Sequence, residues 1–369
     1  MAGGRPTGGG LRDHRNGGLV PVTRFQKLAF AIIFALAALA LGLRVASVAG
    51  QIVFVVAAVA VAGLAWALGE ATEQAGESAG PRVSALLNAS FGNLPEVVIL
   101  VLAIDAGLSD IARASIIGSV LGNVLLILGL ALLLGGWRHG LQTFNERVAA
   151  TNSSMLVLGV IGLGIPTLFH ALEPDVSSEL VLSRWTAGAL LLCYFAYLYF
   201  SFTSPGLRFS DESGELRWTR MEAIAMLAAT AVATGVVSEV LVHSIKPTID
   251  AWGVPREFIG LIVVPFIGNV AEHFSAVKLA VANRVDFAMG IAYGSGIQIS
   301  LLASGIAVFA SVLIGNEVAL VFDPLQLAAL GAAAIGSTLV ARSGETNWLE
   351  GLQLLTIYFI IAAAVWLLG

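Results

Sequence analysis

Long apolar runs recur along the whole chain and alternate with short polar segments. Each run is close to the roughly 20 residues that an α-helix needs to cross a bilayer. Gly and Ala are frequent inside the runs, which allows neighbouring helices to pack closely. The pattern predicts an all-α polytopic membrane protein with about eleven transmembrane helices, near residues 28–46, 51–69, 84–105, 111–135, 149–170, 181–203, 221–244, 257–281, 287–314, 324–341 and 348–368.

The composition agrees with this prediction. Of the 369 residues, 57% are hydrophobic and only 12% are charged, whereas about a quarter are charged in a soluble domain. The single cysteine, Cys193, excludes a disulfide framework and a cysteine-based metal site. Residues 1–24 are rich in Gly and Arg and are predicted to be a disordered basic N-terminus. The stretch "VASVAG" also fits the end of a signal peptide, but Arg44 directly before it favours a retained helix at 25–50.

Basic residues are distributed unequally between the two sides of the predicted membrane. If the N-terminus is cytoplasmic, thirteen Lys and Arg residues lie in cytoplasmic segments and five lie on the opposite side. Because cytoplasmic loops carry the excess of Lys and Arg, this asymmetry predicts a cytoplasmic N-terminus and an external C-terminus. The loop at 205–219 is then inside and the loop at 172–180 is outside.

Two glutamates lie inside apolar runs, where a charge costs at least about 2.5 kcal/mol. They belong to the matched stretches "FGNLPE" (91–96) and "IGNVAE" (267–272). Sliding the chain by 176 positions places Gly92, Asn93 and Glu96 on Gly268, Asn269 and Glu272. The same shift also superimposes the polar and small residues downstream, placing Asp110, Gly118 and Ser119 on Asp286, Gly294 and Ser295. The chain therefore contains an internal repeat.

The two copies are predicted to cross the membrane in opposite directions, because they lie in the third and eighth predicted helices. We expect an inverted-topology repeat: an extra helix at 25–50, a first five-helix half at 51–204, a cytoplasmic linker at 205–219 and a second five-helix half at 220–369. In transporters of this kind the substrate site lies near the midplane, where interrupted helices meet. Gly and Pro beside each asparagine indicate such interruptions.

The matched residues form a candidate cation site. Asn93 and Glu96 are three positions apart on one helical face, as are Asn269 and Glu272. Two carboxylates and two amide oxygens are hard ligands that suit Ca²⁺ and neutralise its charge. Without the metal, two close, buried carboxylates should bind protons, because burial and like charge both disfavour ionisation. The sequence therefore predicts exchange of a cation for protons at one site.

Other polar residues leave alternatives open. A single intramembrane glutamate could be a structural helix contact, but two copies at matched positions disfavour this. Asn123 and Gln298 could each line the site or form an interhelical hydrogen bond. His273 could line the pathway or be a satisfied core histidine.

Four further acidic residues lie near helix ends. Glu73 and Glu239 could be gate or proton-relay carboxylates, or solvated residues at the ends of helices. Asp110 and Asp286 are predicted to cap the helices that follow them.

At these residues the chain resembles the Ca²⁺/H⁺ antiporter (cation/proton exchanger, CAX) family of the Ca²⁺/cation antiporter superfamily. The resemblance covers most of residues 70–315 and is carried by "LLNASFGNLPE" (86–96), "GSVLGNVLLILGLALLLGG" (118–136), "QTFN" (142–145), "GIPTLF" (164–169), "FIGLIVVPFIGNVAEH" (258–273) and "GSGIQISLL" (294–302). The related Na⁺/Ca²⁺ exchangers have Gly-Ser/Thr-Ser-x-Pro-Glu/Asp cores, which this chain lacks.

The resemblance implies a ten-helix core of two inverted halves, in which the first helix of each half slides between the inward-open and outward-open states. It implies that Glu96 and Glu272 bind the transported cation, with Asn93 and Asn269 beside them. It implies no cofactor beyond the transported Ca²⁺ and H⁺. The acidic segment between the halves is only "FSDESGE" (209–215) here, and Pro95 replaces a small residue, which puts a regulatory role and the family's ion preference in doubt.

Several rival functions remain. A channel with the same ion preference would lack coupling to a pH gradient. An intramembrane enzyme is disfavoured, because the sequence has no His-Glu-x-x-His or Gly-x-Ser-x-Gly motif and no Cys/His metal cluster. Among carriers, the alternative is a broader divalent-cation/H⁺ or Na⁺(K⁺)/H⁺ antiporter. We expect the lipid bilayer of a prokaryotic plasma (inner) membrane as the surroundings and no nucleic-acid partner; the oligomeric state is left open.

Overall fold

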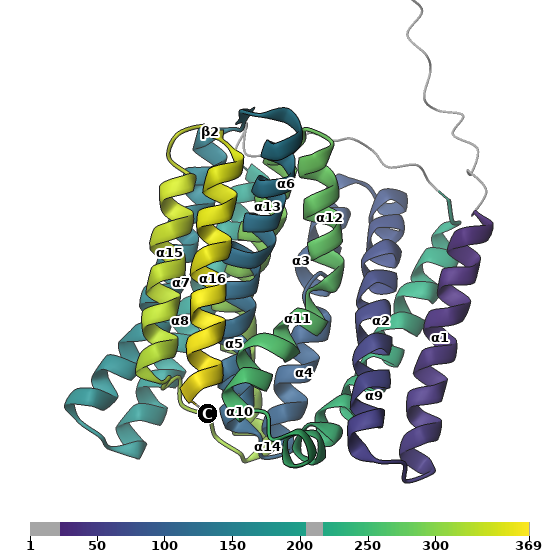
Figure 1. Ribbon diagram of the computed structural model, residues 1–369, viewed down its shortest axis with the longest axis vertical. Coiled ribbons are helices and arrows are strands. Elements are labelled where there is room, and N and C mark those ends of the chain that lie inside the picture. The colour runs from purple at the N-terminus through teal and green to yellow at the C-terminus, as the bar shows by residue number, and fades with distance from the viewer. Residues whose placement is uncertain (1–22, 204–216, 369) are drawn as a thin grey trace, which may run out of the picture.

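The chain folds into a bundle of helices that stand side by side (Figure 1). The computed structural model describes residues 23–203 and 217–368, apart from the side chains of Pro81, Arg82 and Ala85. The predicted disordered residues 1–22 and most of the predicted linker, 205–216, lie outside the described residues. The elements are α1 (Arg24–Val45), α2 (Gly50–Ala79), α3 (Pro81–Phe91), α4 (Leu94–Asp105), α5 (Ser109–Leu121), η2 (Gly122–Ile127), α6 (Leu128–His139), β1 (Gln142–Thr143), α7 (Glu146–Leu172), α8 (Val176–Thr203), α9 (Arg220–Trp252), α10 (Arg256–Phe258), η3 (Ile259–Val263), α11 (Val264–Gly268), α12 (Val270–Val281), α13 (Val285–Ile297), η4 (Gln298–Ala303), α14 (Ser304–Ile314), α15 (Pro324–Val340), β2 (Glu345–Thr346) and α16 (Trp348–Leu368).

Each of the eleven predicted apolar segments coincides with one helix or with a series of consecutive helices. Among the described residues, nine helical segments are long and apolar enough to cross a membrane, and the bent series from α10 to α12 makes up to ten. The remaining segment, α15, is a shorter apolar helix. The prediction of an all-α polytopic membrane protein is confirmed.

Several boundaries differ from the predicted ones. Helix α1 begins at Arg24, because Thr23 and Gln26 form a capping box, so these first described residues are not part of a disordered tail. Helix α2 continues to Ala79 rather than ending near residue 69. Helix α9 continues to Trp252 and ends where Gly253 adopts a left-handed conformation with φ 63°. Polar residues near the membrane surface therefore extend the helices beyond their apolar parts.

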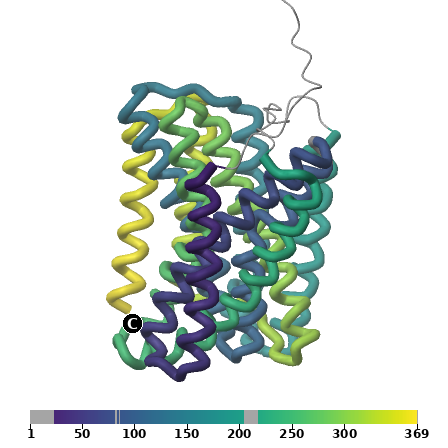
Figure 2. The backbone as a smooth tube through the Cα atoms, turned by 90° about the vertical axis from the view of Figure 1, so that its right-hand side faces the viewer, coloured from purple at the N-terminus to yellow at the C-terminus, as the bar shows by residue number. Residues whose placement is uncertain are grey.

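The two ends of the described chain lie on opposite sides of the bundle. We call the side where α1 begins and where β1 pairs with β2 the upper side, and the side of the C-terminus the lower side (Figure 1). Figure 2 shows the same upper and lower sides after a turn of 90°. The chain runs downward from α3 to α4 and upward from α10 to α12 (Figure 1). An inverted repeat requires these directions, although the arrangement of the two halves as a repeat stays a prediction.

Irregular helix geometry is concentrated at the centre of the bundle. The chain breaks between α3 and α4 at Asn93 and between α11 and α12 at Asn269, and the second break bends the helix by 62°. Three short π-helical segments, η2, η3 and η4, interrupt the helices beside these breaks. Such π segments are rare and frequently occur at functional sites.

Candidate functional site

Both predicted helix interruptions are present, and an asparagine occupies each one. Asn93 has φ −108° and ψ 27°, and Asn269 has φ −94° and ψ 13°, so neither residue continues the helix before it. Pro95 in the first turn of α4 has no N–H, so it cannot donate to the carbonyl of Phe91 across the break. Each asparagine therefore starts a new half-helix whose first turn carries the glutamate three positions later.

Glu96 lies at the contact between the two broken helices. Its side chain is buried, with 4% of the residue exposed. A Cβ added to Gly268 would lie 3.0 Å from the Cγ and 3.1 Å from the Oε1 of Glu96, so the glycine leaves room for this carboxylate. Glu272 is partly buried and close enough for its charge to act on Glu96. The two matched glutamates therefore lie near each other at the two helix breaks.

Two amide hydrogen bonds cross the centre of the site. The Nδ2 of Asn93 donates to the Oε1 of Gln298 at the start of η4. The Nδ2 of Asn123, in η2, donates to the Oδ1 of Asn269 over 3.1 Å and also to the carbonyl of Ser119 over 2.8 Å. Each break is thus tied to a π-helical segment from the other half of the sequence. Asn123 and Gln298 do form interhelical hydrogen bonds, and they form them with the site asparagines.

Unpartnered oxygens are concentrated in this region. Among the described residues, the buried side-chain oxygens here without a hydrogen-bond partner are Asn93 Oδ1, Glu96 Oε1, Glu96 Oε2, Asn123 Oδ1 and Glu272 Oε2. A buried oxygen without a partner is costly, so such a cluster suits a ligand that is a cation or a proton. The described chain contains no cluster of three or more His, Cys, Asp or Glu residues that could hold a metal ion, so the amide oxygens would have to complete the site.

His273 lies beside the site without joining the oxygen cluster. Its Nδ1 donates to the carbonyl of Asn269 over 2.5 Å, and its ring packs 5.1 Å from the ring of Phe266. Its Nε2 has no hydrogen-bond partner among the described residues. The histidine therefore stabilises the break at Asn269 through its Nδ1, and its Nε2 forms no hydrogen bond with the described residues.

The structure does not bring Glu73 and Glu239 into the buried site. Glu239 is exposed and forms an ion pair with Arg44 at 3.3 Å. Glu73 is exposed on α2, near the charges of Glu70 and Glu77. The exposure of both side chains favours the interpretation as solvated residues, although Glu239 lies thirteen residues before the end of α9 rather than at a helix end.

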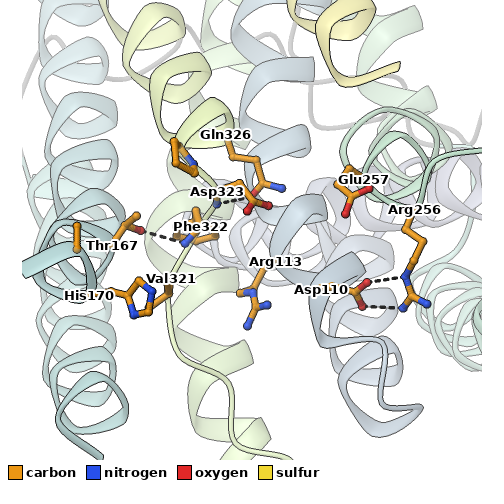
Figure 3. A pocket seen from close by; sticks show the side chains of 12 residues that line it. Asp110, Arg113, Thr167, His170, Arg256, Glu257, Val321, Phe322, Asp323 and Gln326 are labelled. Atoms are coloured by element: carbon orange, nitrogen blue, oxygen red, sulfur yellow. Dashed lines mark hydrogen bonds and ion pairs between the residues drawn. The ribbon is translucent and has the colours of Figure 1, made fainter. Parts of the chain in front are cut away.

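The predicted caps at Asp110 and Asp286 are wrong. Leu108 and Arg284 occupy the N-cap positions, and each aspartate is the second residue of its helix, in the first turn. Asp286 accepts a hydrogen bond from the backbone N–H of Asn145 over 2.6 Å. Asp110 accepts from the Nε of Arg256 over 2.7 Å and from its Nη2 over 3.0 Å (Figure 3).

The sequence alone did not reveal this link between α5 and α10 on the lower side. The pair of Asp110 and Arg256 lines a cavity of about 340 Å³, and Arg113, His170 and Asp323 line the same cavity (Figure 3). One sequence feature pointed to this region. The dipeptide Pro255-Arg256 stands at the start of the second broken helix, as Pro81-Arg82 stands at the start of the first.

A helical membrane bundle whose two broken helices bring two carboxylates and several amide oxygens together has the architecture of a membrane ion transporter. The family model described as sodium/calcium exchanger protein matches residues 49–203 and again residues 222–367. The chain belongs to this family. Its two matched stretches lie close to the two halves predicted from the internal repeat.

Similar proteins carry names from the antiporter branch of the superfamily, as the motifs indicate. The chain is 36% identical over 325 residues to the Ca²⁺/H⁺ antiporter ChaA of Bacillus subtilis, covering 86% of this chain and 92% of that protein. It is 32% identical to a Ca²⁺/H⁺ antiporter of Aphanothece halophytica, covering 85% and 89%, and 34% identical to vacuolar cation/proton exchanger 2 of Arabidopsis thaliana, covering 85% and 75%.

Solved structures share the fold. Native YfkE superimposes with a TM-score of 0.81 and 33% identity, covering 92% of this chain and 99% of that one. An H⁺/Ca²⁺ exchanger CAX superimposes with a TM-score of 0.73 over 92% of each chain, but at 16% identity it supports the fold alone.

Proposed function

We propose that this chain is a secondary active transporter that exchanges Ca²⁺ for H⁺ across a membrane by alternating access. The observation that carries the proposal is the set of buried oxygens of Glu96, Glu272 and Asn93 that lack protein partners at the two helix breaks. The relatives named as Ca²⁺/H⁺ antiporters support the choice of ions.

In the proposed cycle, Glu96 and Glu272 hold either one Ca²⁺ or protons. Two carboxylates neutralise a divalent cation, and amide oxygens, backbone carbonyls and water complete the six to eight ligands that Ca²⁺ accepts. After the cation leaves, the carboxylates take up protons, because two adjacent negative charges are disfavoured in a poorly solvated site. The loaded and the protonated forms are both close to neutral, so both can change access. The empty, doubly charged form changes access least readily, which couples the two fluxes.

The proposed ligands have unequal roles in this structure. The Oδ1 of Asn93 accepts no hydrogen bond from the described residues, whereas the Oδ1 of Asn269 accepts one from the Nδ2 of Asn123. A carbonyl oxygen has a second lone pair, so Asn269 can still bind a cation at this oxygen. The Oδ1 of Asn123 has no partner, so we include it among the groups that line the site.

We expect transport of Ca²⁺, and of Mn²⁺ to a lesser extent, with poor transport of Mg²⁺. Mg²⁺ retains its waters and requires tight octahedral geometry, whereas flexible oxygen ligands at two helix breaks suit a larger ion. Purified protein in proteoliposomes with an imposed pH gradient should accumulate ⁴⁵Ca²⁺ above its equilibrium level, and collapse of the gradient should stop this accumulation. Ca²⁺ flux that ignores the gradient would indicate a channel. Gradient-driven Na⁺ or K⁺ flux without Ca²⁺ flux would support the alternative antiporter.

The proposed location is the plasma membrane of a prokaryote, with the upper side cytoplasmic and Ca²⁺ exported. The excess of Lys and Arg on the N-terminal side supports this orientation. In a Cys193→Ser background, an impermeant maleimide added to intact cells should label Asp175→Cys on the lower side but not Leu141→Cys on the upper side. Both positions are exposed, so access of the reagent depends on the side of the membrane. Labelling of Leu141→Cys alone would reverse the orientation.

A further inference from the structure

A groove of about 550 Å³ lies on the outside of the bundle, between the extra helix α1 and the long helix α9. Its walls are apolar: α1 contributes side chains from the segment 34–41 and α9 from the segment 228–237, and half of them are alanines that leave the space. Val232 and Leu41 on its walls are 68% and 36% exposed. Both helices are long and apolar enough to cross a membrane, so this groove faces lipid chains rather than water.

Contacts at both ends hold the two helices in place around the groove. At the lower end, Arg44 of α1 forms an ion pair with Glu239 of α9 at 3.3 Å. At the upper end, the ring of Phe30 in α1 packs 5.4 Å from the ring of Trp218, directly before α9. The groove is therefore a feature of the folded chain that lies between two fixed contacts.

Aromatic residues indicate the depth of the groove in the membrane. The ring of Phe30 also packs 5.5 Å from that of Trp66 in α2, so two tryptophans lie at the upper end of the groove. Tryptophans concentrate at the level of the lipid headgroups. Phe34, the first wall residue on α1, lies four residues further down the helix, or about 6 Å. The groove therefore begins at the edge of the hydrocarbon core and continues into it.

The helices α1 and α9 begin side by side at the upper end of the groove. The Oε1 of Glu70 accepts from the Nε2 of Gln26 over 3.3 Å and from the Nη1 of Arg217 over 3.2 Å, which links the two starts. Three exposed cations are located here: Arg24, Lys27 and Arg220. Among the described residues, no carboxylate forms an ion pair with any of them.

These cations lie where helix electrostatics favour a negative charge. Arg24 and Arg220 are the first residues of α1 and α9, and Lys27 is the fourth residue of α1. The start of a helix carries a partial positive charge, so cations there are disfavoured unless an anion is present. The carboxylate of Glu222 in α9 already accepts from the backbone N–H of Thr219 as part of a capping box. Two helix starts and three cations therefore form a site for an external anion.

The cationic site and the groove are continuous along α1. Lys27 lies seven and eleven residues before Phe34 and Ala38, so all three side chains project from the same face of the helix. A ligand that fits both parts carries a negative charge at one end and a long apolar chain at the other. An anionic phospholipid has this form, and its phosphate and its chains lie at the depths that the groove requires.

We propose that the groove between α1 and α9 binds one anionic phospholipid from the leaflet on the upper side. Its phosphate lies between Arg24, Lys27 and Arg220, and one acyl chain fills the groove. Basic pockets between transmembrane helices bind anionic headgroups in this way. The lipid would connect the extra helix to α9, the first helix of the predicted second half. The proposal concerns lipid binding alone, so its tests do not depend on the exchange function.

The charge requirement is tested with purified, delipidated protein in detergent and two lipids that have the same acyl chains. Native mass spectrometry should show one dioleoyl phosphatidylglycerol bound for each chain, and dioleoyl phosphatidylcholine should bind at least tenfold more weakly. The triple variant Arg24→Gln/Lys27→Gln/Arg220→Gln should lose at least tenfold in affinity for phosphatidylglycerol. Equal binding of the two lipids would contradict the proposed phosphate site.

The matched control removes the same charge from exposed cations beside β1 and β2 on the upper side: Arg138→Gln, Arg147→Gln and Arg342→Gln. This second triple variant should bind phosphatidylglycerol as the unsubstituted protein does. An equal loss of affinity in the two triple variants would mean that the basic upper surface attracts anionic lipid without a specific site, and the proposal would be wrong.

The acyl chain is tested by filling the groove. Ala229→Phe places a ring in the groove from α9 and should weaken phosphatidylglycerol binding at least tenfold, whereas Ala189→Phe, on an exposed position of α8, should leave it unchanged. Glycerol 3-phosphate, which has the charge but no chain, should not displace the lipid at equal concentration. Full lipid binding by Ala229→Phe, or displacement by glycerol 3-phosphate, would overturn the proposal. A lipid-free dimer that Ala229→Phe dissociates would also overturn it and assign the groove to a second copy of the chain.

Discussion

Glu96→Gln and Glu272→Gln should each abolish Ca²⁺/H⁺ exchange while the protein stays folded. Glutamine keeps the size and one oxygen of each side chain but removes a negative charge and a titratable proton. A site with one carboxylate neither neutralises Ca²⁺ nor completes the protonated form of the cycle. We expect at least a 100-fold loss of gradient-driven uptake, which corresponds to about 2.7 kcal/mol.

The Glu96→Gln variant should still fold, because the carboxylate of Glu96 forms no hydrogen bond within the described chain that the substitution could remove. Both oxygens of Glu96 lack hydrogen bonds among the described residues, and a neutral amide is easier to bury than a charge. The measurement is ⁴⁵Ca²⁺ uptake into everted vesicles, with and without a collapsed pH gradient, alongside the elution profile of each purified variant. Asn93→Ala and Asn269→Ala should weaken Ca²⁺ binding but keep the coupling, because both carboxylates remain.

The matched control is Glu239→Gln, the same substitution in the exposed pair with Arg44. Exposed ion pairs contribute little, so this variant should retain exchange. Asp110→Asn would be a poor control, because Asp110 bridges α5 and α10 on the lower side. Substantial gradient-driven uptake in Glu96→Gln or Glu272→Gln would rule out the shared-carboxylate site.

The apparent affinity for Ca²⁺ should fall steeply as the pH is lowered. A metal site requires deprotonated ligands, so each proton that Ca²⁺ displaces weakens the apparent affinity by up to about tenfold per pH unit. If the two glutamates form one site, the titration belongs to the pair rather than to either residue. Equilibrium Ca²⁺ binding to the purified protein over a series of pH values measures this dependence. An affinity that is constant across the acidic range would separate the Ca²⁺ site from the proton site.

The positions of the helices and of the two glutamates could be predicted because both signals are strong in a membrane protein. In lipid, a run of apolar residues must satisfy its backbone hydrogen bonds internally, which favours a helix. A charged residue within such a run is costly, so it indicates a functional site. The matched Gly-Asn motifs then located the breaks at Asn93 and Asn269. Helix ends were less predictable, because Glu70 and Glu73 continue α2 although they end its apolar stretch.

The contacts within the site could not be predicted, because they depend on packing between distant segments. The sequence marked Asn123 and Gln298 as polar residues in apolar helices, but the pairing of each with an asparagine of the other half is a tertiary feature. Local patterns also gave the wrong role to Asp110, whose partner Arg256 lies on another helix. Gly118 and Gly294 are identical in the repeat, yet an added Cβ would lie 1.9 Å from the carbonyl oxygen of Leu261 at Gly118 and would meet no described atom within 4 Å at Gly294, so their surroundings have no signature in the sequence.

The most direct test of the central claim is to count the protons released when Ca²⁺ binds to the purified protein in weakly buffered detergent solution. If Ca²⁺ and H⁺ share Glu96 and Glu272, addition of Ca²⁺ should acidify the solution at a pH where the pair is protonated. The release should approach two protons for each Ca²⁺ bound, and it should vanish at a pH high enough to empty the pair. Saturable Ca²⁺ binding without proton release at any pH would contradict the account.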